Sequence, residues 1–424
     1  MWNTIKSIFS LLLSYGLLLL GNGMISILLG LRSRLEGFST EITGFIMAGF
    51  FVGMLMGALY AMRVVASVGH IRAFAAFASI MSVAVLAHVL HIHPVTWFVL
   101  RVVSGFCMAG MVMVVESWVN ERATNQTRGR VLSLYMITNY LGAGLGQLMM
   151  LMGDPAQFQL FLIASMAYSF ALVPILLTRA SAPKPSSPQR MNLRELFAIS
   201  PVGVFAMICA GMANSSLNGM GAVFAKEVGL SVAEISTFMA TAILAGMALQ
   251  FPIGRLSDRF DRRTVLTIAS FATGLAALAV IWATGQPVAT LIITMAFYGG
   301  ISFTVYPLSA SQVNDLADPD RLVQVAAGLL IAYGIGASIG PIMAAQSMAI
   351  FGPTGFFQFI IAIHSVLILF TIIRIILRPR GEKTKAPFMP SGGVGVSSKQ
   401  LLTAALDSAQ RIPVTPSSSQ KEKS

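Results

Sequence analysis

Arg101 and Glu116 are ionisable side chains that stand in a single long apolar run of this 424-residue sequence. Placing such a group in a lipid bilayer costs about 2.5–3.5 kcal/mol, so an ionisable residue in an apolar run usually has a function. The Arg101 guanidinium can bind an anionic group or poise a neighbouring acid, or it can be structural and bonded to backbone carbonyls. Glu116 can carry a proton or pair with loop arginines such as Arg128 or Arg63. A helix would hold the two about 22 Å apart, so they act separately.

Uncharged polar and aromatic side chains recur inside several other apolar runs. They comprise Asn22, Ser26, Tyr135, Asn139, Gln147, Asn214, Ser215, Asn218, Tyr298, Ser302, Tyr306 and Tyr333. Hydroxyl, amide and aromatic groups together with one cation, Arg101, suit a small amphiphilic or anionic solute. Each serine or asparagine can instead form a hydrogen bond between helices, and the tyrosines can be packing residues.

The stretch GRLSDRFDRR, residues 254–263, concentrates charge between two apolar runs. Six of its ten residues are charged, whereas only 10% of the whole chain is. Arginine and lysine hold a loop on the cytoplasmic side of a membrane, but acids contribute little to that orientation. Membrane topology therefore explains the arginines and leaves Asp258 and Asp261 without an explanation.

The elements that position these residues follow from the composition. The chain is 56% hydrophobic, with a mean hydropathy of +0.78, and a soluble domain would carry roughly 25% charged residues. Apolar runs of about 20 residues can each cross a ~30 Å hydrocarbon core as a helix. The sequence thus predicts an all-α polytopic membrane protein whose partner is the lipid bilayer. The net charge of +12 lies in short loops and at the C-terminus, where topology explains it, so no nucleic acid is expected.

Twelve membrane spans are predicted from the apolar runs. They cover residues 8–30, 41–62, 73–91, 95–117, 131–152, 157–178, 200–222, 231–253, 264–284, 287–309, 323–348 and 354–377. Of the 28 Lys and Arg residues, 24 lie in the termini and even-numbered loops, and only Arg32, Arg34 and Lys226 lie in odd-numbered loops. Because positive residues gather on the cytoplasmic side, both termini are expected in the cytoplasm, with the protein in a bacterial inner (plasma) membrane.

Short matches at a nearly constant spacing show that the sequence repeats itself. EITGFIMAGFFVGM from Glu41 matches EISTFMATAILAGM from Glu234, ESWVNERA matches ASQVNDLA, and Gly142 and Gly146 match Gly336 and Gly340. The predicted organisation is an N-terminal six-helix bundle over 1–179, a cytoplasmic linker over 180–198, a C-terminal six-helix bundle over 199–378 and a disordered cytoplasmic tail over 379–424. Parallel six-span repeats are typical of secondary transporters, whose site lies between the halves near mid-membrane.

The charged loop resembles the cytoplasmic signature of the major facilitator superfamily, Gly-x-x-x-Asp-Arg-x-x-Arg-Arg. It is carried by Gly254, Asp258, Arg259, Arg262 and Arg263. The corresponding stretch of the first half, GALYAMRVVASVGHIR, keeps Gly57, Arg63 and Arg72 but has Ala61 and Met62 at the positions of the Asp and Arg. Together with VESWVNERATNQTRGRV in the following even-numbered loop, this pattern resembles the YcaD-like branch. The resemblance covers about residues 5–378.

The resemblance implies an ion-pair gate at the cytoplasmic ends of the helices. Its members would be Gly254, Asp258, Arg259, Arg262, Arg263, Gly57, Arg63, Arg72 and Glu116. Asp258 would cap or pair with the N-terminus of span 11, and Arg259 and Arg262 would pair with Asp315 or Asp318. Exposed ion pairs contribute only ~0–1 kcal/mol each, which suits a gate whose states differ by a few kcal/mol. The alternative is that the arginines serve only as topological anchors.

The resemblance also implies that spans 1, 4, 7 and 10 line a central solute cavity, with spans 5 and 11 adding to it. The residues expected there are Asn22, Ser26, Arg101, Tyr135, Asn139, Asn214, Ser215, Asn218, Tyr298, Ser302 and Tyr333. Arg101 and Gly105 are similar to the Arg-x-x-x-Gly motif of span 4 that the superfamily associates with proton-coupled transport. Ser104 stands where that motif usually has Gln.

The function that follows is secondary-active transport of a small organic solute by alternating access, coupled to protons, with export favoured over uptake. A uniporter and a non-transporting sensor or scaffold on the same fold remain alternatives. The sequence contains no Walker motif, no metal-ligand cluster and no nucleophile–base set. Neither an enzyme nor a primary pump is expected, no cofactor or metal is assigned, and the protein is expected to act as a monomer.

Overall fold

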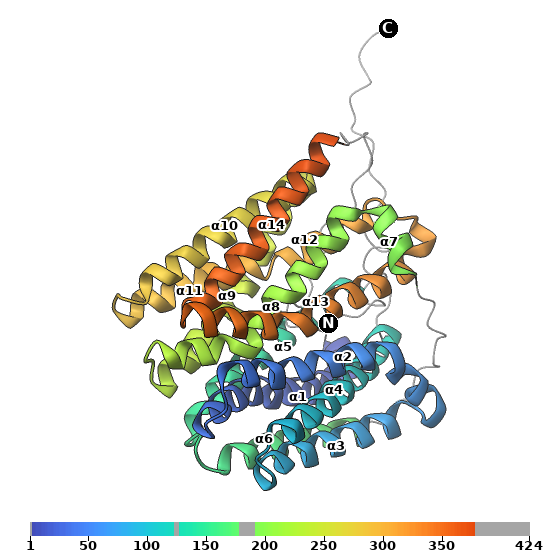
Figure 1. Ribbon diagram of the computed structural model, residues 1–424. Helices are drawn as coiled ribbons and strands as arrows, with labels where there is room; N and C mark the ends of the chain where they lie inside the picture. The colour runs from blue at the N-terminus through green and yellow to red at the C-terminus, as the bar shows by residue number, and fades with distance from the viewer. Residues whose placement is uncertain (1, 123–126, 178–190, 378–424) are drawn as a thin grey trace.

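The computed structural model describes residues 2–122, 127–177 and 191–377. Every regular element in these ranges is a helix (Figure 1). The predicted tail over 379–424 and most of the predicted linker over 180–198 lie outside the described residues. The short helix α7 (Leu193–Ile199) begins inside the predicted linker and ends just beyond it.

Each half of the chain contributes six helical spans. The N-half has α1 (Trp2–Leu35), α2 (Thr40–Val68), α3 (His70–Leu90), α4 (Pro94–Arg122), α5 (Arg128–Leu148) and α6 (Gln159–Leu176), with the 3-10 helix η1 (Met149–Met152) after α5. The C-half has α8 (Pro201–Glu227), α9 (Val232–Arg259), α10 (Arg262–Ala283), a broken span of α11 (Val288–Ser302) and α12 (Val305–Asn314), α13 (Leu322–Phe351) and α14 (Gly355–Leu377). The 3-10 helix η2 (Pro319–Arg321) precedes α13.

The spans differ in how apolar they are. In the described residues ten are long and apolar enough to cross a membrane, and an eleventh is added if α7 and α8, which meet at a bend of 119°, count as one span. The remaining span is α5, whose 21 residues include Arg128, Arg130, Asn139 and Gln147. Helix α5 packs between α1 and α9, and its Asn139 and Gln147 side chains are buried inside the protein. The predicted all-α polytopic architecture is confirmed.

Side chains at the helix starts fix where several helices begin. Ser39 accepts a hydrogen bond from the Ile42 amide before α2, and Ser231 forms a capping box with Glu234 at the start of α9. Asp261 accepts from the amides of Arg263 and Thr264 at 2.8 and 3.3 Å. A capping side chain of this kind stabilises a helix by about 1 kcal/mol. Asp261, which topology leaves unexplained, is thus the N-cap of α10.

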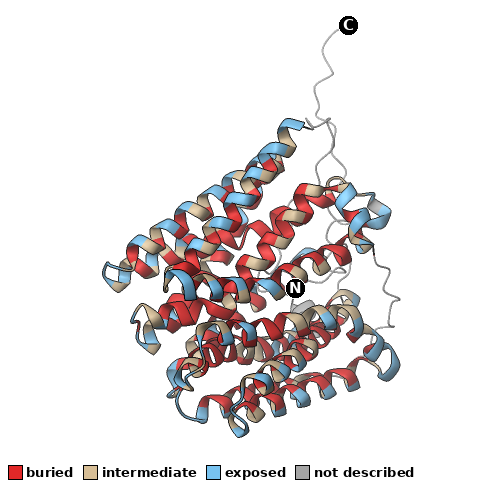
Figure 2. Cartoon of the chain, in the orientation of Figure 1, coloured by how far each residue is buried: buried red, intermediate tan, exposed pale blue. Residues whose placement is uncertain are grey.

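The two halves lie side by side, with α1–α6 in the lower part of Figure 1 and α8–α14 in the upper part. They meet where α1 packs on α8, α2 on α13 and α5 on α9. Buried residues face the interior of each half and the surface between the halves, whereas exposed residues cover the outside (Figure 2). These six helices form the contact between the halves.

Glycines of the internal repeat let helices approach closely within each half. A Cβ added at Gly142 or Gly146 of α5 would clash with Leu19 or Leu20 of α1. The matching glycines Gly336 and Gly340 of α13 meet backbone carbonyls of α8 in the same way. Such small-residue contacts are the usual basis of tight helix packing in membranes. The repeat read from the sequence therefore corresponds to a repeated helix pair in the structure.

Candidate functional site

Glu116 lies in a buried network of polar side chains from α1, α4 and α5 of the N-half. The Tyr135 hydroxyl donates to Glu116 Oε1 at 2.7 Å and lies 3.1 Å from the Tyr15 hydroxyl, which also accepts from the Asn139 amide. The rings of Tyr15 and Tyr135 stack with centroids 4.8 Å apart. Glu116 is only 1% exposed. The sequence predicts Glu116, Tyr135 and Asn139 as functional residues but does not predict that Tyr15 joins them.

A second group of polar side chains comes from the C-half. Tyr306 of α12 and Tyr333 of α13 meet edge to face with ring centroids 5.2 Å apart. The Asn214 side chain of α8 hydrogen-bonds the Tyr333 hydroxyl. Glu116 lies within electrostatic range of Tyr306 as well as of Tyr15 and Tyr135. One acid of the N-half therefore lies near hydroxyl groups of both halves.

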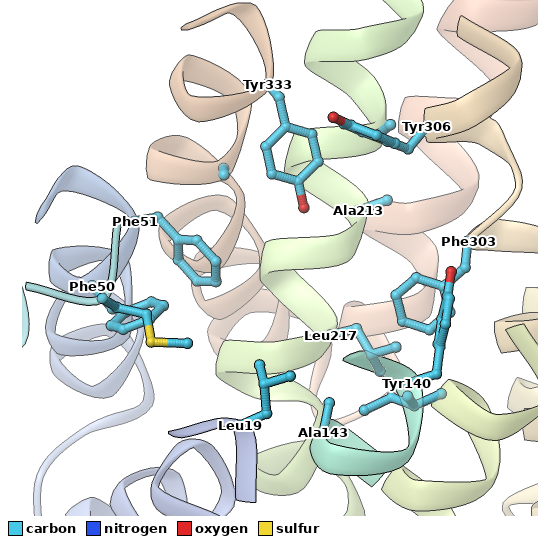
Figure 3. Close-up of a cluster of buried hydrophobic side chains, with 14 of the residues drawn as sticks. Leu19, Phe50, Phe51, Tyr140, Ala143, Ala213, Leu217, Phe303, Tyr306 and Tyr333 are labelled. Carbon is cyan, nitrogen blue, oxygen red and sulfur yellow. The ribbon is translucent and has the colours of Figure 1, made fainter. Parts of the chain in front are cut away.

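Span 10 is broken next to this group, since α11 ends at Ser302 and α12 begins at Val305. The sequence predicts one span over 287–309, and the structure has one span over Val288–Asn314 that is interrupted at residues 303–304 and ends beyond the predicted end. Figure 3 shows Phe303, at the break, in one cluster of buried side chains with Tyr306 and Tyr333. The same cluster includes Leu19, Phe50, Phe51, Tyr140 and Ala143 from the N-half and Ala213 and Leu217 from α8. Broken helices at the midplane commonly form the binding sites of transporters.

Several other predicted cavity residues satisfy their hydrogen bonds within their own helices. Ser26 donates to Gly23 O at 2.9 Å, Ser215 to Met212 O at 3.2 Å, and Asn218 to Asn214 O at 2.9 Å. Tyr298 packs edge to face against Phe357, with centroids 5.2 Å apart, Ser302 is buried beside the break, and Asn22 is half-buried. Their contribution to a solute site stays a prediction.

Arg101 lies inside the N-half. Its guanidinium Cζ is 4.4 Å from the ring centroid of Phe50 of α2, and it interacts electrostatically with His88 of α3 and Tyr168 of α6. Helices α3 and α6 pack on each other and on α4 and α1. The structure therefore brings Arg101 together with residues of its own half and not with the Tyr306–Tyr333 group.

In the charged loop, Arg262 and Asp315 form the expected ion pair. Arg262 Nε lies 2.7 Å from Asp315 Oδ2, and both side chains are fully buried. Arg262 also donates to Ser257 Oγ at 3.1 Å and lies 3.4 Å from Asp258 Oδ1. All of these residues belong to α9, α10 and the end of α12. The pair thus joins three helices of one half.

The other predicted gate residues have separate surroundings. Gly254 is buried in α9, Arg259 is exposed, and Arg263 Nε lies 3.6 Å from Asp261 Oδ1. In the first half, Gly57 packs against Phe106 and Ala109 of α4, Arg63 lies over the Tyr60 ring at 5.4 Å, and Arg72 is exposed. Whether this set works as a gate stays a prediction.

The halves also touch at the end of the bundle opposite the charged loop, a contact that the sequence does not predict. We call this the odd-loop end, where α1 and α8 finish and α2 and α9 begin. Glu227 Oε1 of α8 lies 3.5 Å from Arg34 Nη2 of α1 and accepts from Thr40 Oγ1 of α2 at 3.2 Å. Arg34 and Glu227 end the first spans of the two halves. They also belong to the few charges in odd-numbered loops, which is the signal that could have revealed this contact.

Packing between the halves continues from the odd-loop end toward the middle of the helices. Gly30 packs against Val223, and Gly219 against Met47. Gly44 of α2 meets α13 closely enough that an added Cβ would clash with it. The ion pair and these contacts hold the halves together at the odd-loop end.

Two matching helical halves around a buried polar group define a polytopic membrane transporter. The family model described as Major Facilitator Superfamily matches residues 11–203 and 203–409, once for each half. The chain belongs to the Major Facilitator Superfamily. The predicted arrangement of two six-helix bundles is thereby confirmed.

Relatives agree with this membership, and solved structures share the fold. The uncharacterized MFS-type transporter YcaD of Escherichia fergusonii is 27% identical over 328 residues, which cover 77% of this chain and 85% of that protein. The predicted resemblance to the YcaD-like branch is confirmed, and such relatives are named as transporters rather than enzymes. A crystal structure of the nucleoside transporter NupG has a TM-score of 0.71 at 14% identity and covers 88% of this chain and 99% of its own. A crystal structure of a D-xylose–proton symporter has a TM-score of 0.64 at 14% identity and covers 86% of this chain and 96% of its own.

Proposed function

We propose that the chain is a secondary-active transporter that moves a small organic solute by alternating access and is coupled to protons. The observation that carries this proposal is the position of Glu116, which bonds Tyr135 in the N-half and lies within electrostatic range of Tyr306 in the C-half. A carboxyl group at the junction of two halves can exchange a proton. Its surroundings change when the halves move, so protonation and movement can be coupled.

The solute site is assigned to the polar side chains around this acid. Tyr15, Asn139, Asn214, Tyr306 and Tyr333 offer hydroxyl, amide and aromatic groups. Asn139 Oδ1 is buried and has no hydrogen-bond partner among the described residues, so it can accept from a solute. Mostly apolar walls with a few fixed polar groups are typical of sites for small ligands. We favour a small amphiphile as the solute and export as the direction, because the cluster in Figure 3 is largely aromatic and apolar.

Membrane orientation is part of the proposal. With the even-numbered loops in the cytoplasm, the odd-loop end faces the outside of the inner membrane. The Arg34–Glu227 contact then closes the outer face, and solute reaches the site from the cytoplasm. A single chain contains both halves, so we propose a monomer as the working unit.

Replacing Glu227 by glutamine should weaken this closure. The ion pair is partly exposed, with 33% and 20% of the Arg34 and Glu227 side chains accessible, so the loss is at most about 1 kcal/mol. A cysteine in place of Met47, buried between the halves, should react with an external membrane-impermeant maleimide up to about fivefold faster in Glu227→Gln. Lys226→Gln removes the adjacent exposed charge and serves as the control. An unchanged labelling rate, or an equal change in the control, would count against the closure.

Transport itself is tested in two steps. A thermal-shift screen of metabolites and drugs on the purified protein should find ligands, because binding to the folded state raises its stability. Hits are then offered to proteoliposomes with an imposed pH gradient. The proposal expects accumulation that a protonophore collapses. Flux that ignores the protonophore would favour a uniporter, and binding without any flux would favour a sensor or scaffold.

A further inference from the structure

Two buried polar side chains of the N-half lie within electrostatic range of Arg101, whose guanidinium lies over Phe50 of the cluster in Figure 3. Arg101 comes from α4, His88 from α3 and Tyr168 from α6, and we call them the N-half cluster. Their exposed fractions are 3%, 1% and 0%. Arg101 interacts electrostatically with each of the other two. His88 on α3 and Tyr168 on α6 therefore lie near Arg101, and Phe50 of α2 lies beside the guanidinium.

Polar atoms of the cluster lack partners. Arg101 Nε, the Tyr168 hydroxyl and His88 Nε2 are buried and have no hydrogen bond within the part of the chain that the structure describes. In the same ranges Arg101 forms no ion pair. Buried polar atoms are normally hydrogen-bonded, so each exception calls for an explanation such as a ligand that the chain itself does not provide.

The charge of Arg101 is likewise uncompensated by its neighbours. His88 Nδ1 lies 2.7 Å from the Ala84 carbonyl, to which it donates, so a neutral ring leaves Nε2 as an acceptor and adds no negative charge. Tyr168 is a neutral phenol. The Phe50 ring attracts the guanidinium, but a cation–π contact contributes only about 0.5–2 kcal/mol. A guanidinium remains protonated in proteins, so its positive charge persists.

Acidic side chains of the described N-half are elsewhere. Glu36 forms an ion pair with Arg32, while Glu121 and Asp154 are exposed. Glu41 lies in the first turn of α2 at the odd-loop end, and Glu116 lies about 22 Å further along α4. Burying a charge without a counter-charge costs several kcal/mol. A negative ligand would remove that cost.

We propose that the N-half cluster binds a small monovalent anion, which accepts hydrogen bonds from Arg101 Nε and the Tyr168 hydroxyl. The anion is either a free halide or the carboxylate of the transported solute, since both present one negative charge to the same two donors. The halide form is independent of the proposed function. The carboxylate form rests on it and would extend the solute class to organic acids.

Trp97 provides a direct readout, because it lies one helical turn before Arg101 and its ring centroid is 5.5 Å from that of His88. The experiment uses the full-length protein in lipid nanodiscs at constant ionic strength. Iodide is the probe for a bound halide, and acetate is the competitor that stands for a carboxylate. Iodide bound at the cluster should quench tryptophan fluorescence saturably, and Trp97→Phe should lose the saturable part. Arg101→Gln should abolish it and Tyr168→Phe should raise the apparent Kd several-fold, whereas Arg194→Gln, at an exposed arginine, should leave it unchanged.

Arg101→Lys keeps the positive charge but lacks Nε, and it serves as a second variant in case Arg101→Gln does not fold. It should bind iodide more weakly than the wild type.

Competition by chloride without competition by acetate identifies a free halide. Competition by acetate and by the transported solute identifies a carboxylate. The proposal is overturned if folded wild-type protein shows no saturable quenching and no saturable rise in unfolding temperature with either anion. It is equally overturned if Arg101→Gln binds as the wild type does. Solute binding and flux are measured separately, so failure here leaves the proposed transport standing.

Discussion

Replacing Glu116 by glutamine should abolish solute accumulation driven by a pH gradient while solute exchange continues. Glutamine keeps an oxygen that can accept from Tyr135, which lies 2.7 Å from the carboxylate, but it cannot take up a proton. With one proton per solute, a gradient of two pH units stores about 2.7 kcal/mol, which corresponds to about 100-fold accumulation. The variant should reach about equal concentrations on both sides.

The measurement compares net uptake with counterflow in proteoliposomes. Counterflow requires movement of the loaded carrier but no net proton transfer, so it should persist in Glu116→Gln. Glu121→Gln changes an exposed acid five residues further along α4 and is the matched control. Full accumulation in Glu116→Gln would show that the coupling proton is carried elsewhere.

Replacing Asp315 by asparagine should destabilise the C-half strongly. Arg262 and Asp315 are 2.7 Å apart with no exposure of either side chain. Removing one partner of a buried ion pair leaves the other charge uncompensated and typically costs about 3–5 kcal/mol. The thermal unfolding midpoint of purified Asp315→Asn should fall well below that of the wild type.

Asp258→Asn is the matched control for this effect. Asp258 lies 3.4 Å from the same arginine, but its side chain is 35% exposed, so its loss should cost no more than about 1 kcal/mol. The double variant Arg262→Met with Asp315→Leu should recover most of the stability, because apolar residues can replace a buried pair. Equal midpoints for Asp315→Asn and the wild type would refute the structural role of the pair.

Much of the fold is predictable from the sequence because membrane spans are long and locally specified. Apolar runs locate the helices, and the Gly142–Gly146 and Gly336–Gly340 match reveals the repeat. The structure differs mainly where tertiary packing outweighs local pattern. Helix α8 continues to Glu227, beyond the predicted end at 222, and span 10 breaks at residues 303–304. A helix does not stop where the apolar run stops, and a break is stabilised by neighbours that the local sequence does not identify.

The candidate site was predictable in its chemistry more than in its grouping. Span position indicates that Glu116, Tyr135 and Asn139 are inside, but only the packing of α1 on α5 brings Tyr15 to them. Arg101 stands in the expected span, yet its side chain lies over Phe50 of α2 and within electrostatic range of His88 and Tyr168. Which face of a helix meets which neighbour depends on crossing angles, and these are set by contacts distant in sequence.

Alternating access at the junction of the halves is tested most directly by electron–electron distance measurements in nanodiscs. One spin-label pair at Leu35 and Ala233 reports the odd-loop end, and a second at Ser67 and Phe260 reports the opposite end, in a chain whose buried Cys107 and Cys209 are replaced by alanine. We expect two populations whose ratio changes with a ligand from the thermal-shift screen and with pH, the first distance lengthening as the second shortens. A single distance in each pair, unchanged by ligand and pH, would contradict the account.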